Sequence, residues 1–280
     1  MSSSASRSLP LLPRSPQTRA SRRHTLVAFA LAAAMIAFVG AVVAAVIINK
    51  PPPVDPKTGC ALDGVDQLVE IAFDPSDPIP KDEQPAVVAE IGRRAQALPV
   101  GSRLTLRALV PRSAKAAKPL FDQCKPRDGS SVSVWFGNPA MQDAIFAKAF
   151  AVPVEQAQQR IAEAKGQSDS SPIIQALADI ATDPAAAQAR HRSLVVVGDM
   201  LENSAICNMY RAPCDFAAVE RAGFKAVRDL KGRLAGAEVT LLQIRRAEVG
   251  RYQTPAQHAF WTALMAYAGM RPEQLRFERL

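Results

Sequence analysis

The chain has 280 residues, of which 48% are hydrophobic and 21% charged. This composition is that of a globular protein and excludes a wholly disordered, collagen-like or coiled-coil chain. The net charge is +8, but residues 1–50 hold six Lys and Arg and no acidic residue, so that residues 51–280 carry only +2. The basic charge therefore lies at the N-terminus, and nucleic-acid binding by the rest of the chain is not expected.

Residues 25–48 form an apolar run without a single charge. A helix of this length rises about 36 Å, which is enough to cross a hydrocarbon core of about 30 Å. Five Arg precede the run and only Lys50 follows it closely. The positive-inside rule then leaves the N-terminus in the cytoplasm and sends the following residues across.

We therefore expect a single-pass protein of a bacterial inner membrane, with its C-terminal domain in the periplasm. A twin-arginine export signal around Arg22 and Arg23, and a cleaved secretory signal, are the alternatives. The expected organisation is a basic cytoplasmic tail at 1–24, a transmembrane helix at 25–48, a proline-rich linker at 49–66 and a domain at 67–280.

Strand and helix patterns alternate within the domain. The stretch 111–139 reads as irregular, with a possible edge strand at 132–136. The alternation predicts an α/β fold with a doubly wound, mostly parallel sheet. We expect strands at 68–73, 104–110, 193–199, 237–244 and 275–280, and helices at 82–98, 141–165 (broken near Pro153), 172–182, 216–234 and 254–269.

Two of the predicted strands end in an acidic residue, Asp74 and Asp199. Ser76 and Asp77 follow the first of these strands, and Ser171 precedes a helix. The carboxyl ends of parallel strands meet at one edge of a sheet, where ligands bind. Carboxylate and hydroxyl oxygens are the ligands of hard cations, so the sequence predicts a site for Mg²⁺, Mn²⁺ or Ca²⁺ at this edge.

The order of these residues resembles the von Willebrand factor A family. That family has Asp-x-Ser-x-Ser after its first strand, a Thr in a later loop and an Asp at the end of its fourth strand. Asp74 and Ser76 match the first two motif positions, Ser171 matches the Thr within Ser-Pro-Ile-Ile-Gln-Ala-Leu, and Asp199 matches the last position. Pro78 replaces the last Ser of the motif, so one hydroxyl ligand is missing.

The resemblance covers residues 67–270 and implies a Rossmann-like fold with a degenerate metal-ion-dependent adhesion site. In the family an acidic group of a partner protein completes the coordination of the metal. The expected function is therefore adhesion or assembly without turnover, with another envelope protein as the partner. The loop from Leu201 to Cys214, with Asn203, Ser204 and Tyr210, would supply specificity.

Each site residue also has a purely structural interpretation. Ser171 before Pro172 is a good helix cap, and Asp74 and Asp77 beside prolines suit turns. A metal-free scaffold of an envelope complex is one alternative function. A periplasmic hydrolase of the haloacid-dehalogenase type is another, although Asp74-Pro75-Ser76 lacks the second Asp of that family's motif.

All four cysteines follow the apolar run, and an exported location allows disulfides. Of the three possible pairings we favour Cys207 with Cys214, which would stiffen the loop beside the site, and Cys60 with Cys124. Arg245 and Arg246, at the end of a predicted strand, are expected to be exposed to solvent.

Overall fold

The computed structural model describes residues 17–48, 53–114, 117–133, 137–166 and 168–279. The chain divides into two units, Met1–Pro52 and Pro53–Leu280. The first unit contains helix α1 (Gln17–Ile48). Its segment Arg23–Ala45 has a mean hydropathy of 2.7 and is long and apolar enough to cross a membrane. This confirms the predicted N-terminal apolar helix.

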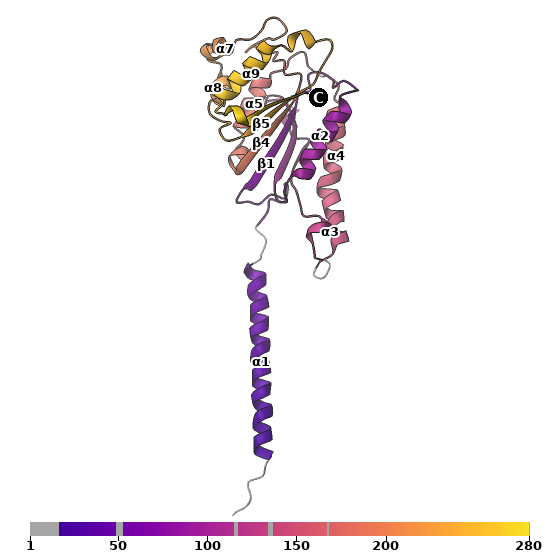
Figure 1. Ribbon diagram of the computed structural model, residues 1–280, viewed down its shortest axis with the longest axis vertical. Helices are drawn as coiled ribbons and strands as arrows, with labels where there is room; N and C mark the ends of the chain where they lie inside the picture. Colours follow the sequence, from indigo (N-terminus) through magenta and orange to yellow (C-terminus); the bar gives the residue numbers. More distant parts are fainter. Residues whose placement is uncertain (1–16, 49–52, 115–116, 134–136, 167, 280) are drawn as a thin grey trace, which may run out of the picture. The chain divides into compact units, whose positions relative to one another are not determined.

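The second unit is built on a six-stranded sheet with the order β3-β2-β1-β4-β5-β6 (Figure 1). Neighbouring strands are parallel except β2 and β3, which are antiparallel. The predicted α/β class with a mostly parallel sheet is confirmed. The strands are β1 (Val65–Phe73), β2 (Arg103–Ala108), β3 (Phe121–Cys124), β4 (Ala189–Gly198), β5 (Glu238–Gln243) and β6 (Leu275–Arg279).

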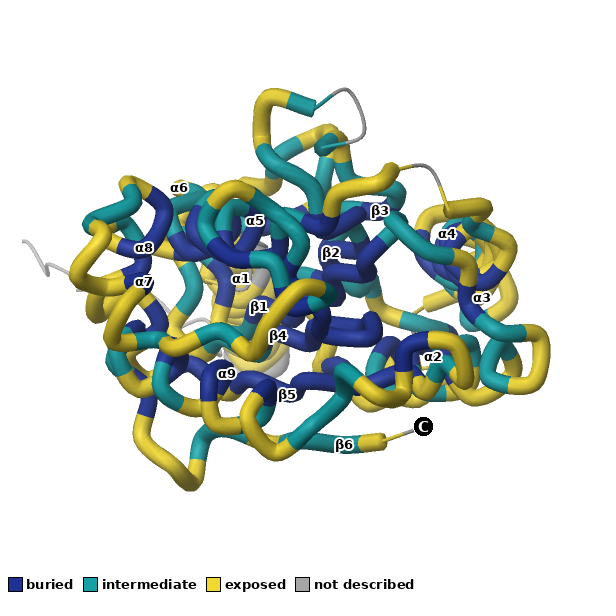
Figure 2. Tube along the Cα trace, turned by 90° about the horizontal axis from the view of Figure 1, so that it is seen from above, coloured by how far each residue is buried: buried dark blue, intermediate teal, exposed yellow. Residues whose placement is uncertain are grey.

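Helices pack on both faces of the sheet, because successive strand side chains point to opposite sides. Leu194 and Val196 of β4 belong to one core cluster, and Val195 and Val197 belong to the other. Figure 2 shows these buried strands between the two groups of helices. The first cluster includes residues of α5 (Ile173–Ala181), α7 (Phe216–Ala222), α8 (Lys225–Leu230) and α9 (Pro255–Tyr267), and the second those of α2 (Gln84–Ala97) and α4 (Val152–Ala162).

Strand β3 lies within the stretch that the sequence predicted to be irregular. It has only four residues, which is too short for a hydrophobic alternation to stand out. The candidate strand at 132–136 lies partly outside the described residues, and Val132 and Ser133 are not in a strand.

Two predicted helices differ from the observed ones. The helix expected at 216–234 is divided by Gly223, whose φ of 67° ends α7 in a left-handed cap. The helix expected at 141–165 consists of α3 (Pro139–Phe146), a π-helical turn (Ala147–Ala151) and α4. Pro153 does not end the helix; it directly follows the π-helical turn, and Ala151 and Val152 before it keep helical dihedral angles.

The domain begins earlier than predicted. Cys60 forms a disulfide with Cys124, and Val54 pairs with Ala61. Residues 53–66 therefore belong to the compact second unit, and residues 49–52 of the expected linker lie outside the described residues. The second disulfide joins Cys207 to Cys214, so both favoured cysteine pairs lie at disulfide distance.

Candidate functional site

Asp74 directly follows β1 at the carboxyl edge of the sheet. Its N–H donates to the carbonyl of Val197 at 2.8 Å, which continues the β1–β4 ladder by one residue. The side chain is only 8% exposed. Its Oδ1 accepts the backbone N–H of Ser76 at 2.9 Å, and its Oδ2 accepts the hydroxyl of Ser171. Burial raises the pKa of Asp74, and these hydrogen bonds act in the opposite direction.

Asp199 follows the neighbouring strand β4 and is 5% exposed. Its Oδ1 accepts the N–H of Leu201 at 3.0 Å. Its Oδ2 accepts the Tyr210 hydroxyl at 3.3 Å and Nη1 of Arg246 at 2.9 Å. Burial, assisted by the negative charge of Asp74, raises the pKa of Asp199 to about 6, although Arg246 and the Leu201 N–H lower it.

Arg246 links the loop that carries Asp77 to the loop that carries Asp199, and the sequence did not identify it as a site residue. It follows β5, and its Nη1 contacts Oδ2 of Asp77 as well as that of Asp199. Its side chain is 15% exposed, so the expectation of a solvent-exposed Arg246 was wrong, whereas Arg245 is exposed. The available signal was that a third strand ends in charged residues at the same edge of the sheet.

Glu202 is a second buried charge that the sequence did not single out. Its side chain is fully buried; Oε2 accepts the N–H of Ile174 at 2.9 Å, and Oε1 accepts the Ser204 hydroxyl at 2.5 Å. Burial raises the pKa of Glu202 to about 7. Glu202, and not Ser171, satisfies the N-terminus of α5, so the capping interpretation of Ser171 was wrong.

The loop after β4 lies against the start of α5. Asn203 and Ser171 exchange two backbone hydrogen bonds of 2.9 and 3.0 Å. Asn208 Nδ2 donates to Oδ1 of Asn203 at 2.8 Å. The structure thus places the predicted specificity residues beside the aspartate cluster, which consists of Asp74, Asp77 and Asp199. Each of the three specificity residues, Asn203, Ser204 and Tyr210, is partly exposed.

Helix α9 fixes the turn that carries Asp199. Met200 has φ of 60°, an uncommon value for a residue with a side chain. Its carbonyl accepts Nε2 of Gln257 at 2.6 Å and Nε1 of Trp261 at 2.8 Å, and Gln257 also donates to the Asp199 carbonyl at 3.0 Å. The strained turn is therefore held by buried side chains of α9, which positions the Asp199 carboxylate.

The predicted cation ligands can be tested by their present partners. Asp74 accepts the Ser171 hydroxyl, and Asp77 and Asp199 share the Arg246 guanidinium. Among the described residues, no group of three His, Cys, Asp or Glu side chains is arranged to hold a metal ion. In this structure the oxygen atoms of these carboxylates are engaged in an internal network of hydrogen bonds and ion pairs.

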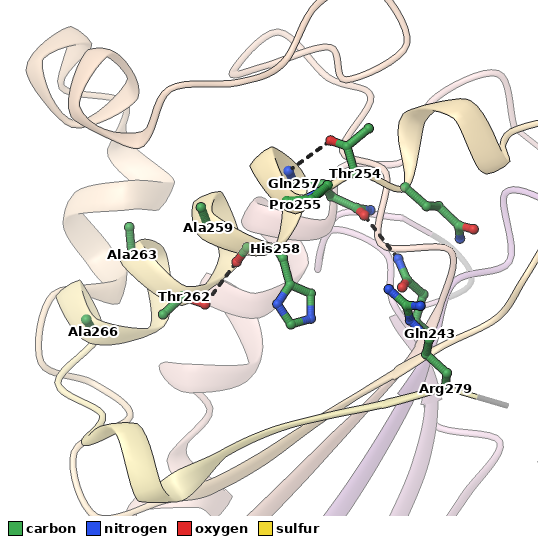
Figure 3. A pocket seen from close by; sticks show the side chains of 11 residues that line it. Gln243, Thr254, Pro255, Gln257, His258, Ala259, Thr262, Ala263, Ala266 and Arg279 are labelled. Atoms are coloured by element: carbon green, nitrogen blue, oxygen red, sulfur yellow. Dashed lines mark hydrogen bonds between the residues drawn. The ribbon is translucent and has the colours of Figure 1, made fainter.

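A separate cavity of about 620 Å³ lies over α9 and the last two strands (Figure 3). His258, Thr262 and Arg279 line it, together with Gln243 and Gln257, which hydrogen-bond to each other at 3.0 Å. Burial lowers the pKa of His258, whose ring packs against Phe277. The cavity adjoins the glutamine network behind Asp199, and Asp74, Asp77 and Asp199 do not line it.

Comparison with protein-family models and with curated proteins finds no match to this chain.

Proposed function

We propose that the protein is a membrane-anchored domain of the von Willebrand A type that binds another envelope protein through the carboxyl edge of its sheet. The strand order β3-β2-β1-β4-β5-β6 supports this fold, because it is the order of a doubly wound sheet with its switch point between β1 and β4. Asp74 and Asp199 follow these two strands, so the motif residues flank the switch point.

The ordered loop 201–214 is the observation that carries the proposal. It is closed by the Cys207–Cys214 disulfide and by internal hydrogen bonds from Ser204 and Asn208. Ala205 and Arg211 are exposed on it. A surface that is already ordered loses little conformational entropy on binding, which favours recognition of a partner.

The environment of Asp74 supports binding over hydrolysis. A nucleophilic carboxylate must reach its substrate. Asp74 is buried, and both of its oxygens accept hydrogen bonds within the domain. This arrangement suits a structural role for Asp74 better than a haloacid-dehalogenase type of attack.

The charge around α1 supports the proposed topology. Arg19, Arg22 and Arg23 lie at its N-terminal end, which favours a cytoplasmic N-terminus. The two disulfides of the second unit suit an oxidising compartment such as the periplasm.

The proposal is tested by charge reversal on the exposed loop. Full-length protein carrying Arg211→Glu is solubilised in detergent, purified from its membranes, and its co-purifying proteins are quantified. The control is Arg190→Glu, the same change at the amino end of β4, where the side chain is 84% exposed. We expect Arg211→Glu to lose a partner that wild type and Arg190→Glu retain; equal recovery with all three proteins would contradict the proposal.

A further inference from the structure

We propose that the amino edge of the sheet is a membrane-contacting surface, through which the domain rests against the lipid bilayer. By the amino edge we mean the segments around the first residues of the parallel strands: residues 53–64, the turn 99–102 and helix α3 (Pro139–Phe146). The inference rests on the proposed membrane anchoring by α1. It concerns the end of the sheet opposite to the proposed partner-binding face.

Exposed large hydrophobic side chains of the second unit are concentrated at this edge. The structure describes six of them, and five belong to the amino edge: Val54, Leu62, Val100, Met141 and Ile145, each between 43% and 64% exposed. In the described loops at the carboxyl edge, no large hydrophobic side chain is exposed to this degree. One exposed apolar side chain is ordinary, whereas several at one end of a domain indicate an interaction surface.

Backbone hydrogen bonds hold the first two segments of the amino edge together. The N–H of Cys124 donates to the carbonyl of Thr58 at 2.8 Å. The carbonyl of the next residue, Lys125, accepts the N–H of Gly101 at 2.8 Å. The turn that carries Val100 therefore lies at the same end of the sheet as the segment that enters β1.

Helix α3 lies at the end of the domain at which β1 begins (Figure 1). Nε2 of Gln142 donates to the Arg127 carbonyl at 2.8 Å, which attaches the helix to the chain that follows β3. The whole of α3 is described, and none of its residues is buried. Met141 and Ile145 are four residues apart and so share one face of the helix. That face is exposed and apolar.

The short connection to α1 identifies lipid as the partner of this surface. Helix α1 ends at Ile48, and the second unit begins at Pro53. Even fully extended, the chain between these two residues spans at most about 18 Å. The N–H of Leu62 donates to the Pro53 carbonyl at 3.0 Å, so Leu62 lies close to the point of attachment. A bilayer that contains α1 is therefore the apolar phase within reach of the amino edge.

Charges of both signs lie around this edge. Exposed Arg190 pairs with Asp66 at 3.8 Å, and both Lys57 and Asp63 are exposed. We therefore expect the edge to bind by inserting apolar side chains among the lipid headgroups, with little preference for anionic lipid. A few such side chains bind a bilayer reversibly, so this contact adds to α1 and would not hold the domain alone through alkaline extraction.

The test is photo-crosslinking to lipid in liposomes of phosphatidylcholine that contain a tagged lipid and the purified full-length protein. A crosslinking residue is placed at Met141 or Val100, with Ala205 on the exposed carboxyl-edge loop as the control. We expect roughly ten times more lipid adduct from Met141 and from Val100 than from Ala205, because insertion withdraws apolar side chains from water.

A matched pair of variants tests whether the apolar side chains act together. With the crosslinking residue at Met141, Leu62→Ser should lower the yield of lipid adduct, because the surface loses one inserted side chain. Asp63→Ser, at the adjacent exposed residue, should leave the yield unchanged. Equal yields in these two variants would contradict a shared docking surface.

A crosslinking residue at Phe38 in α1 separates failure of this inference from failure of the anchor. Lipid adducts from Phe38 with equal yields from Met141, Val100 and Ala205 would overturn the inference alone. So would adducts between two copies of the chain, in place of lipid, from Met141 and Val100. No lipid adduct from Phe38 would contradict the proposed anchoring and this inference with it.

Discussion

Gly198 allows Asp74 to lie against the end of β4. A Cβ atom at Gly198 would lie 2.9 Å from Cβ of Asp74 and 3.5 Å from Cε of Met200. We expect Gly198→Ala to lower the free energy of unfolding by about 1–3 kcal/mol, because the buried Asp74 must shift. Chemical denaturation of the detergent-solubilised protein measures the change.

Gly250→Ala is the control for this prediction, since a Cβ at that exposed position meets nothing within 4 Å. It should change the stability by no more than a few tenths of a kcal/mol. Equal stability of the two variants would show that Asp74 and Gly198 are not in close contact.

The raised pKa of Glu202 predicts that the stability of the domain depends on pH. Its pKa is raised from 4.5 in the unfolded chain to about 7 in the folded domain. The folded state therefore binds the proton more tightly than the unfolded state does. The resulting contribution to the free energy of unfolding is fully present below pH 4.5 and is lost as the pH rises through about 7. The loss amounts to roughly 3 kcal/mol by linkage.

Glu202→Gln should flatten this dependence in urea titrations between pH 4.5 and pH 8. Some slope should remain, because the pKa of Asp199 is raised to about 6 and acts in the same direction. Ser204→Ala is a useful comparison, since it removes a hydrogen-bond donor to Glu202 but leaves the titrating group. An unchanged slope in Glu202→Gln would contradict the assignment.

At the scale of residues, the sequence predicted that Asp74, Ser171 and Asp199 lie together, but it did not predict which groups form ion pairs or hydrogen bonds with them. Asp74, Ser171 and Asp199 were expected at one edge because parallel strands end together. Arg246 and Glu202 were missed because their burial depends on tertiary contacts, with Asp77 and with the start of α5. No local sequence pattern distinguishes a charged residue that is buried and paired at the end of a strand from one that is exposed to solvent.

At the scale of elements, the two disulfides should contribute unequally to stability. Cys60 and Cys124 are 64 residues apart, and Cys207 and Cys214 are 7 apart. Loop-closure entropy then gives about 4 kcal/mol for the first and about 2.5 kcal/mol for the second. Replacing each pair by serine and measuring urea unfolding should show the larger loss for Cys60 and Cys124; the reverse order would contradict this account.

Strands with a continuous or alternating apolar pattern were predicted well, because burial on the sheet imposes that pattern. The centre of β4 is the clearest case, and five of the six strands were expected near their observed positions. Short elements were not predicted: β3 has four residues, and the separation of α7 from α8 depends on the non-helical conformations of Gly223 and Phe224.

At the scale of the whole molecule, α1 should anchor the chain. The segment Arg23–Ala45 is exposed along its described length and is long and apolar enough to cross a membrane. We expect the full-length protein to stay in the membrane fraction after alkaline extraction. Residues 53–280, exported with a cleavable signal, should be released; retention of this fragment would show a second membrane attachment.

The most direct test of the central claim is photo-crosslinking in intact cells from single positions on the full-length protein. A crosslinking residue is placed at Ala205 or Arg211 on the strand-end loop, and at Asp66 or Arg190 at the opposite edge; all four are exposed. The account predicts one discrete crosslinked partner from the loop positions and none from the opposite edge. The same partner from Asp66 or Arg190, with no product from the loop, would contradict it.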